Sequence, residues 1–212
     1  MVFDFDGVIL DTEMALIEAY GEVHARHGVP FDQSLHLRSV GHADYTFDPW
    51  SAFDPAIDRA ALDAHRRQLN VERNRQLEPL PGVVPLLREA READLKLGMA
   101  SNSGHAHVDG QLERLGLLGH FDFIACREDI SRPKPSPEIY QLVLQKLGVV
   151  GRAAVAVEDS HTGLTAARRA GLQVVAVPNR ATAHHEFADA SWQVQSLLEV
   201  NLAGLIARLG VG

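Results

Sequence analysis

Short runs of apolar residues alternate along most of this chain with longer segments in which apolar residues recur every three or four positions. The runs at 95–100, 121–126, 153–157 and 172–177, with a shorter one that ends at Asp4, are typical of strands buried on both faces. The longer segments predict helices over 83–93, 103–115, 136–147, 162–170 and 195–209. This alternation predicts an α/β fold, a Rossmann-like, doubly wound parallel sheet of five strands.

Residues 11–80 interrupt this rhythm and contain no strand-like run. One helix is predicted from Thr12 to about His27, ended by Gly28. A second is predicted from Asp54-Pro55 to about Gln76, with Ile57, Ala61 and Ala64 along its apolar stripe. We therefore expect two units, an α/β core of residues 1–10 and 81–212 and an all-helical insertion of residues 11–80.

Polar groups follow four of the predicted strands. Asp4 and Asp6 follow the first, and the later groups are Ser101-Asn102-Ser103, Arg132-Pro133-Lys134-Pro135 and Glu158-Asp159-Ser160. Ligands bind beyond the carboxyl ends of parallel strands, so these groups are expected at one edge of the sheet. Ser103 is also expected to cap the next helix.

The chemistry of these groups indicates a cation. Asp4 and Asp6 repel each other and are costly to bury, unless one is protonated or a cation lies between them. Carboxylate and amide oxygens suit a hard ion such as Mg²⁺, which also accepts a substrate phosphate. Lys134 would add positive charge for an anionic substrate.

Composition excludes several other classes of function. The chain has 212 residues, 46% of them hydrophobic, and a formal net charge of −8, which argues against nucleic acid or an anionic membrane as partner. Its single cysteine, Cys126, rules out an internal disulfide and is expected to be a buried thiol. Neither a membrane-spanning stretch nor a signal peptide is evident. We expect a cytoplasmic monomer.

Four sequence motifs together resemble the haloacid dehalogenase superfamily of phosphotransferases. They are D-F-D-G-V-I-L-D-T-E at 4–13, A-S-N-S at 100–103, R-P-K-P at 132–135 and V-E-D-S at 157–160. The helical insertion resembles the cap of the subgroup that contains β-phosphoglucomutase and sugar-phosphate phosphatases. The resemblance covers essentially the whole chain.

The resemblance implies a role for each residue of the four motifs. Asp4 would be the nucleophile that forms an aspartyl-phosphate, and Asp6 the general acid and base, with its backbone carbonyl on the metal. Mg²⁺ would be the cofactor, with Asp4 and Asp159 as further ligands and Glu158 as a ligand or as a neighbour of the ligands. Phosphoryl oxygens would be bound by the side chains of Lys134 and Ser101 and by the backbone amide of Asn102.

The expected activity is Mg²⁺-dependent hydrolysis of small phosphorylated metabolites, in particular sugar phosphates. One alternative is a sugar-phosphate mutase, but Leu16 stands where the mutase pattern has a histidine and cannot transfer protons. The other is a non-catalytic module that binds a phosphorylated ligand. The helical insertion offers Arg38, His42 and His24 as candidate polar groups for substrate selection.

Overall fold

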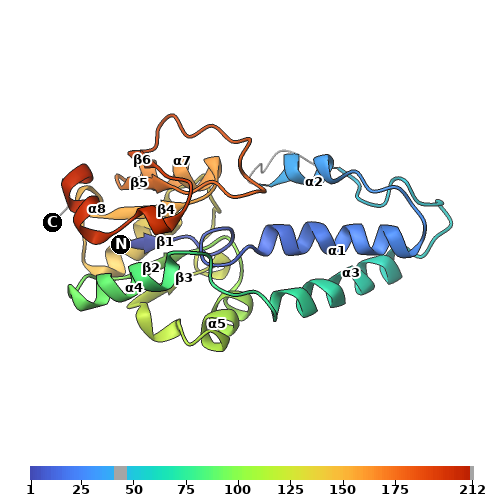
Figure 1. Ribbon diagram of the computed structural model, residues 1–212, viewed down its shortest axis with the longest axis horizontal. Helices are drawn as coiled ribbons and strands as arrows, with labels where there is room; N and C mark the ends of the chain where they lie inside the picture. The colour runs from blue at the N-terminus through green and yellow to red at the C-terminus, as the bar shows by residue number, and fades with distance from the viewer. Residues whose placement is uncertain (41–46, 211–212) are drawn as a thin grey trace.

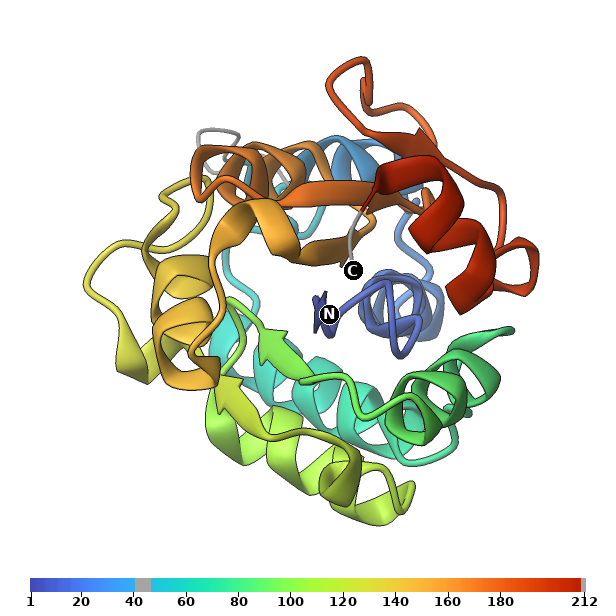
Figure 2. The same cartoon turned by 90° about the vertical axis from the view of Figure 1, so that its left-hand side faces the viewer.

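The computed structural model describes residues 1–40 and 47–210, and it contains one parallel sheet with helices on both faces (Figures 1 and 2). The strand order is β3-β2-β1-β4-β5-β6, and every pairing is parallel. The strands are β1 (Val2–Phe3), β2 (Gly98–Ala100), β3 (Phe123–Ala125), β4 (Val155–Glu158), β5 (Gln173–Ala176) and β6 (Trp192–Gln193). The α/β class is confirmed, with six strands in place of the five predicted.

Alternating residues of β1 anchor two separate cores. Phe3 packs into a core with α4 (Val83–Glu92), α5 (His105–Arg114) and α8 (Leu202–Leu209). Val2 packs into the other core, with α6 (Glu138–Leu147) and α7 (His161–Arg169). Successive side chains of a strand point to opposite faces, so β1 is covered on both sides and lies at the centre of the fold.

The last helix is shorter than its apolar pattern predicts. It begins at Leu202 because the Asn201 side chain accepts a hydrogen bond from the amide of Gly204 and caps it. The preceding segment forms only a single 3₁₀ turn, Leu197–Glu199.

Three helices extend away from the sheet (Figure 1): α1 (Thr12–Arg26), α2 (Gln33–Ser39) and α3 (Arg59–Asn74). Helix α3 begins four residues later than predicted, because the Asp58 side chain accepts hydrogen bonds from the amides of Ala60 and Ala61. Its buried stripe contains Leu62 and Leu69, whereas Ala61 and Ala64 are exposed. The short helix α2 was not predicted.

Helices α1 and α3 share a small core with the segment between them, formed by Ala19, Val23, Trp50, Phe53, Leu62 and Leu69. Helix α2 packs through Leu37 against a separate cluster that includes Met14 and Ile17. The division of the chain into core and cap stays a prediction. Of the candidate polar groups, His24 is buried and bonded to the backbone carbonyls of Pro30 and Pro49, and His42 lies outside the described residues. Across residues 1–40 and 47–210, every helix is too short or too polar to cross a membrane.

Candidate active site at the carboxyl edge of the sheet

Asp4 and Asp6 follow β1, where the chain turns sharply into α1. Asp4 leaves the sheet with its amide bonded to the carbonyl oxygen of Val157 at 3.0 Å. The turn depends on Gly7, which has a φ of +76°. A Cβ atom there would lie 2.1 Å from Asp159 Oδ2, so glycine is also required for the close approach of the next carboxylate.

A cavity of about 300 Å³ opens at this edge of the sheet. Its lining includes five residues predicted to form the site, among them the acidic Asp4, Asp6 and Asp159 and the basic Lys134. The fifth is Asn102, and the part of the chain that extends from the sheet contributes Glu13, Ser39 and Val40. Groups from both parts of the fold therefore face one shared cavity, as expected of a ligand site.

Lys134 lies between two carboxylates. Its Nζ is 2.9 Å from Asp4 Oδ1 and 2.7 Å from Glu158 Oε1, and the residue is only 4% exposed. Burial lowers the pKa of Lys134, but the two carboxylates outweigh burial and raise it above its ordinary value. The side chain is therefore a fixed ammonium beside the predicted nucleophile.

Glu158 binds the Lys134 ammonium from within the protein interior and does not line the cavity. It is fully buried and accepts hydrogen bonds from Lys134 and from the hydroxyl of Tyr140. Gly163, in the first turn of α7, makes room for it, because a Cβ there would lie 2.0 Å from the Glu158 carboxyl group. The sequence did not indicate Tyr140 or Gly163 as supports of the site.

Asp159 is held by an asparagine that comes from the loop after β5. Asn179 Nδ2 donates to Asp159 Oδ2 at 2.7 Å and to the carbonyl oxygen of Gly7 at 3.1 Å. Burial, with Asp4 and Glu158 nearby, raises the pKa of Asp159 well above its usual range. Asn179 lies in a loop of ordinary composition, so no sequence pattern pointed to it.

Asp6 is surrounded by hydrogen-bond donors. Thr12 Oγ1 donates to Oδ1 and Ser103 Oγ donates to Oδ2, each at 2.6 Å, while His107 Nε2 lies 3.4 Å from Oδ1. Burial raises the pKa of Asp6, but His107, Ser103 and Thr12 outweigh burial, so the pKa is lowered. The predicted general acid and base is therefore a carboxylate in this arrangement.

The three residues after β2 contribute to the site in different ways. Ser101 is fully buried, accepts a hydrogen bond from the amide of Ser103 at 3.0 Å, and does not line the cavity. Asn102 lines it, and its Oδ1 accepts the backbone amide of Lys134 at 3.0 Å. The prediction that Ser103 caps α5 is wrong, because Gly104 is the N-cap residue and the Ser103 hydroxyl bonds Asp6.

A second chamber of about 250 Å³ adjoins the first and shares Asp6, Glu13 and Ser103 with it. Leu16, Asn70 and Asn74 line its far side. The side-chain oxygens of both asparagines are buried and have no hydrogen-bond partner in the described part of the chain. The chamber therefore offers unfilled polar contacts beside Asp6.

The charges at the edge of the sheet suit a hard cation. Ligand oxygens of Asp4, Glu158 and Asp159 lie within 4.8 Å of one another, and Lys134 balances only part of their charge. Burial raises the pKa of Asp4 to about 8, although Lys134 opposes the rise. A buried group of three carboxylates with one ammonium keeps a proton or binds a cation, and its oxygens are the donors that Mg²⁺ prefers.

This arrangement of a parallel sheet with acidic groups and a lysine beyond its carboxyl edge is that of a known class of hydrolase. The family profile described as haloacid dehalogenase-like hydrolase matches residues 1–177. The chain belongs to the haloacid dehalogenase-like hydrolases, and it is a hydrolase of the phosphatase type.

Three relatives illustrate the match. The chain is 35% identical to the Bacillus subtilis protein YhcW, over 99% of this chain and 96% of that protein. It is 32% identical to the phosphorylated carbohydrates phosphatase of Thermotoga maritima, over 82% of each chain. Among solved structures, CbbY from Rhodobacter sphaeroides in complex with phosphate superposes with a TM-score of 0.76 at 31% identity, covering 96% of this chain and 97% of that one.

Proposed function

We propose that this protein is a Mg²⁺-dependent phosphatase that hydrolyses sugar phosphates through an aspartyl-phosphate on Asp4. The observation that carries the proposal is the position of Asp4, Lys134 and Asp159 around one cavity at the carboxyl edge of the sheet. The relatives named above, one a phosphatase of phosphorylated carbohydrates and one bound to phosphate, support the substrate class.

In the first step, a carboxylate oxygen of Asp4 attacks phosphorus and the bond to the sugar oxygen breaks. The Lys134 ammonium, held 2.9 Å from Asp4, is placed to stabilise the negative charge of the phosphoryl oxygens. Asp6 donates a proton to the departing sugar oxygen. Asp6 must first gain that proton, and an incoming phosphate dianion favours this because a nearby negative charge raises the pKa of a carboxyl group.

In the second step, Asp6 takes a proton from water, which attacks phosphorus and releases Asp4 and inorganic phosphate. The carboxylate form of Asp6 is the one that this step needs, and Thr12, Ser103 and His107 favour that form by donating hydrogen bonds or positive charge to it. We assign Ser101 to holding Asn102 and Ser103 in place, so that the backbone amide of Asn102 faces the phosphate.

Mg²⁺ would be bound by the carboxylates of Asp4 and Asp159 and by the backbone carbonyl of Asp6. When bound, it supplies positive charge that lets a negative nucleophile meet a negative phosphate. Glu158 is assigned to Lys134 instead, because one of its oxygens already accepts hydrogen bonds from Lys134 and Tyr140.

The second chamber would receive the sugar. Its described lining contains no lysine or arginine, and the free oxygens of Asn70 and Asn74 can accept hydrogen bonds from hydroxyl groups. Leu16 in its wall cannot move a proton between sugar oxygens, which favours hydrolysis over isomerisation. We propose that residues 11–80 form the cap that covers this substrate.

The test is phosphate release from a panel of sugar monophosphates, with and without Mg²⁺, beside the Asp4→Asn variant. We expect phosphate release that requires Mg²⁺ and is lost in Asp4→Asn. The variant should still unfold in one cooperative thermal transition, like the wild type, which would show that its fold is intact. Isomerised sugar phosphate in place of free phosphate would identify a mutase. Saturable binding of the panel without any turnover would identify a binding module and contradict the proposal.

A further inference from the structure

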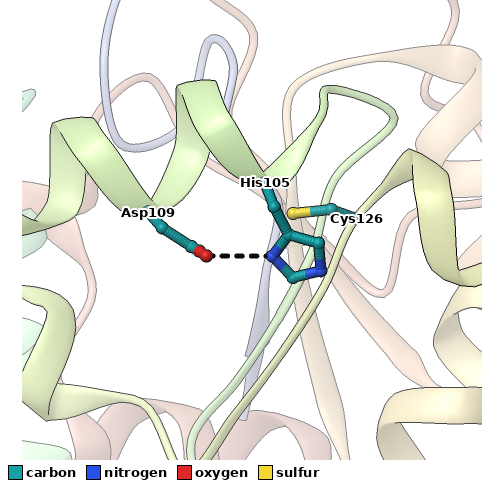
Figure 3. A group of neighbouring side chains, drawn as sticks. All are labelled: His105, Asp109 and Cys126. Atoms are coloured by element: carbon teal, nitrogen blue, oxygen red, sulfur yellow. Dashed lines mark hydrogen bonds and ion pairs between the residues drawn. The ribbon is translucent and has the colours of Figure 1, made fainter.

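A second group of potential metal ligands lies outside the catalytic cavity. His105 and Asp109 lie one turn apart on α5, and Cys126 follows β3 beside them (Figure 3). Their ligand atoms, a ring nitrogen, a carboxylate oxygen and a sulfur, all lie within 4.8 Å of one another. The catalytic proposal uses none of the three residues.

Each ring nitrogen of His105 contacts a carboxylate, and one of the two carboxylates belongs to the candidate ligand Asp109. Nε2 lies 2.7 Å from Asp129 Oδ2, while Nδ1 lies 3.0 Å from Asp109 Oδ2 (Figure 3). A carboxylate on the far nitrogen is the usual support of a histidine that binds a metal, because it fixes the tautomer and the ring orientation. If Nε2 carries the proton, the lone pair of Nδ1 faces a carboxylate oxygen, and that contact needs a proton or a metal ion between them.

Two details indicate an open place for a cation. Asp109 Oδ1 is buried and lacks a hydrogen-bond partner within the described residues. Cys126 is a free cysteine, and the capping contact between its side chain and the backbone amide of Asp129 holds the sulfur near Asp109. The Asp129 carboxylate accepts the amide of Cys126 in return, at 2.8 Å, so this loop is held against His105.

We propose that His105, Asp109 and Cys126 bind one transition-metal cation of the Zn²⁺ type, separate from the catalytic Mg²⁺. A nitrogen, an oxygen and a sulfur ligand together select Zn²⁺ or Co²⁺ over Mg²⁺, which prefers oxygen alone. One thiolate and one carboxylate neutralise a divalent ion. His105 and Asp109 are 37% and 42% exposed, so the ion can enter from solvent and keep a water molecule as its fourth ligand.

Binding would exchange protons for the ion. Burial raises the pKa of Cys126 to about 12, and the nearby carboxylates of Asp109, Glu128 and Asp129 add to the rise. The sulfur therefore carries a proton when no cation is present, and the ion displaces that proton to solvent as the metal–sulfur bond forms. The bound ion would join the first turn of α5 to the segment that follows β3.

The experiment uses Co²⁺ as a coloured probe on protein treated with a chelator, in the presence of excess Mg²⁺. Cys126 is the only cysteine in the chain, so a thiolate-to-cobalt charge-transfer band in the near ultraviolet must come from this residue. We expect the band to saturate at one Co²⁺ per chain and to disappear when Zn²⁺ is added.

Variants separate this site from the catalytic one. Cys126→Ser should abolish the band, and Asp129→Asn should weaken Co²⁺ binding about 10–100-fold, the usual effect of removing the support of a histidine ligand. Asp4→Asn and His120→Gln should keep the band, the first because it alters only the catalytic site and the second because His120 is not one of the clustered ligands.

Absence of the band from wild-type protein whose circular dichroism is native would overturn the proposal. It would leave His105 as an imidazolium paired with Asp109 and Asp129. Saturation at one Co²⁺ per two chains would also overturn it, because the ion would then bridge two molecules. The absorbance readout does not depend on turnover, so it stands or falls separately from the phosphatase assignment.

Discussion

The replacement of Lys134 by methionine tests the charge arrangement of the site. Methionine keeps a flexible apolar chain of similar length but removes the ammonium that lies 2.9 Å from Asp4 and 2.7 Å from Glu158. Both carboxylates stay buried, with exposures of 7% and 0%, and water cannot replace the lost partner of Glu158. The variant therefore isolates the cost of unpaired buried charge.

Removing one partner of a buried ion pair costs about 3–5 kcal/mol. We expect Lys134→Met to lose that much stability near pH 7, and to lose turnover by about 10²-fold or more, because a group that stabilises charge in the transition state is gone. The exposed Lys96→Met is the matched control, expected within about 0.5 kcal/mol of wild type.

The pH dependence of the deficit follows from the carboxylates. Lys134 opposes the rise in the pKa of Asp4, so without the ammonium the folded-state pKa of Asp4 rises further above its unfolded value of about 4. A raised folded-state pKa contributes stability that is present at low pH and is lost as pH rises through that pKa. Because the pKa of Asp4 is already about 8 in the wild type, both proteins should lose stability in parallel from pH 5 to pH 8. The deficit of Lys134→Met should therefore stay nearly constant over that range and grow only above it.

The assay is urea unfolding followed by circular dichroism at pH 5, 7 and 8, without added metal. Equal stability of wild type and Lys134→Met at all three values would refute the reasoning, as would a deficit that grows towards low pH.

Three further predictions concern the supports of the site. Gly163→Ala should lower the free energy of unfolding by about 1–3 kcal/mol in urea and should also lower turnover, because its Cβ would lie 2.0 Å from the Glu158 carboxyl group. The control Gly110→Ala has open space in the middle of α5 and should raise the free energy of unfolding by about 0.5–1 kcal/mol. Asn179→Ala should raise the Mg²⁺ concentration needed for half-maximal turnover about 10–100-fold, and an unchanged requirement would contradict its assigned role. Wild-type protein in a chelator should become less stable from pH 5 to pH 8, by up to about 1.4 kcal/mol per pH unit, because burial raises the pKa of Asp4 to about 8. Saturating Mg²⁺ should remove this dependence of stability on pH.

The edge of the sheet was predictable because parallel strands impose it. Any polar group that directly follows a buried parallel strand lies at the same edge, so Asp4 and Asp159 could be placed together from local pattern alone. Lys134 was placed at this edge in the same way, as a positive charge near the carboxylates, and in the structure it forms ion pairs with Asp4 and Glu158.

The contacts that orient these groups could not be predicted, because they join residues distant in sequence through side chains of ordinary composition. Asn179 lies 172 positions from Gly7, whose carbonyl it binds. Local signals also competed with tertiary ones: Ser103 has the pattern of a helix cap, yet its hydroxyl bonds Asp6, 97 positions away. The two-residue strand β6 is too short for an apolar run to indicate it.

The central claim is that Asp4 becomes phosphorylated during turnover. Quenching the enzyme in acid during steady-state hydrolysis of a sugar phosphate, reducing with borohydride and mapping peptides by mass spectrometry tests this directly, because reduction converts a phosphorylated aspartate to homoserine. We predict homoserine at position 4 in wild-type protein, and none when substrate is omitted. Steady turnover with an unmodified Asp4, or with the modification at Asp6, would contradict the account.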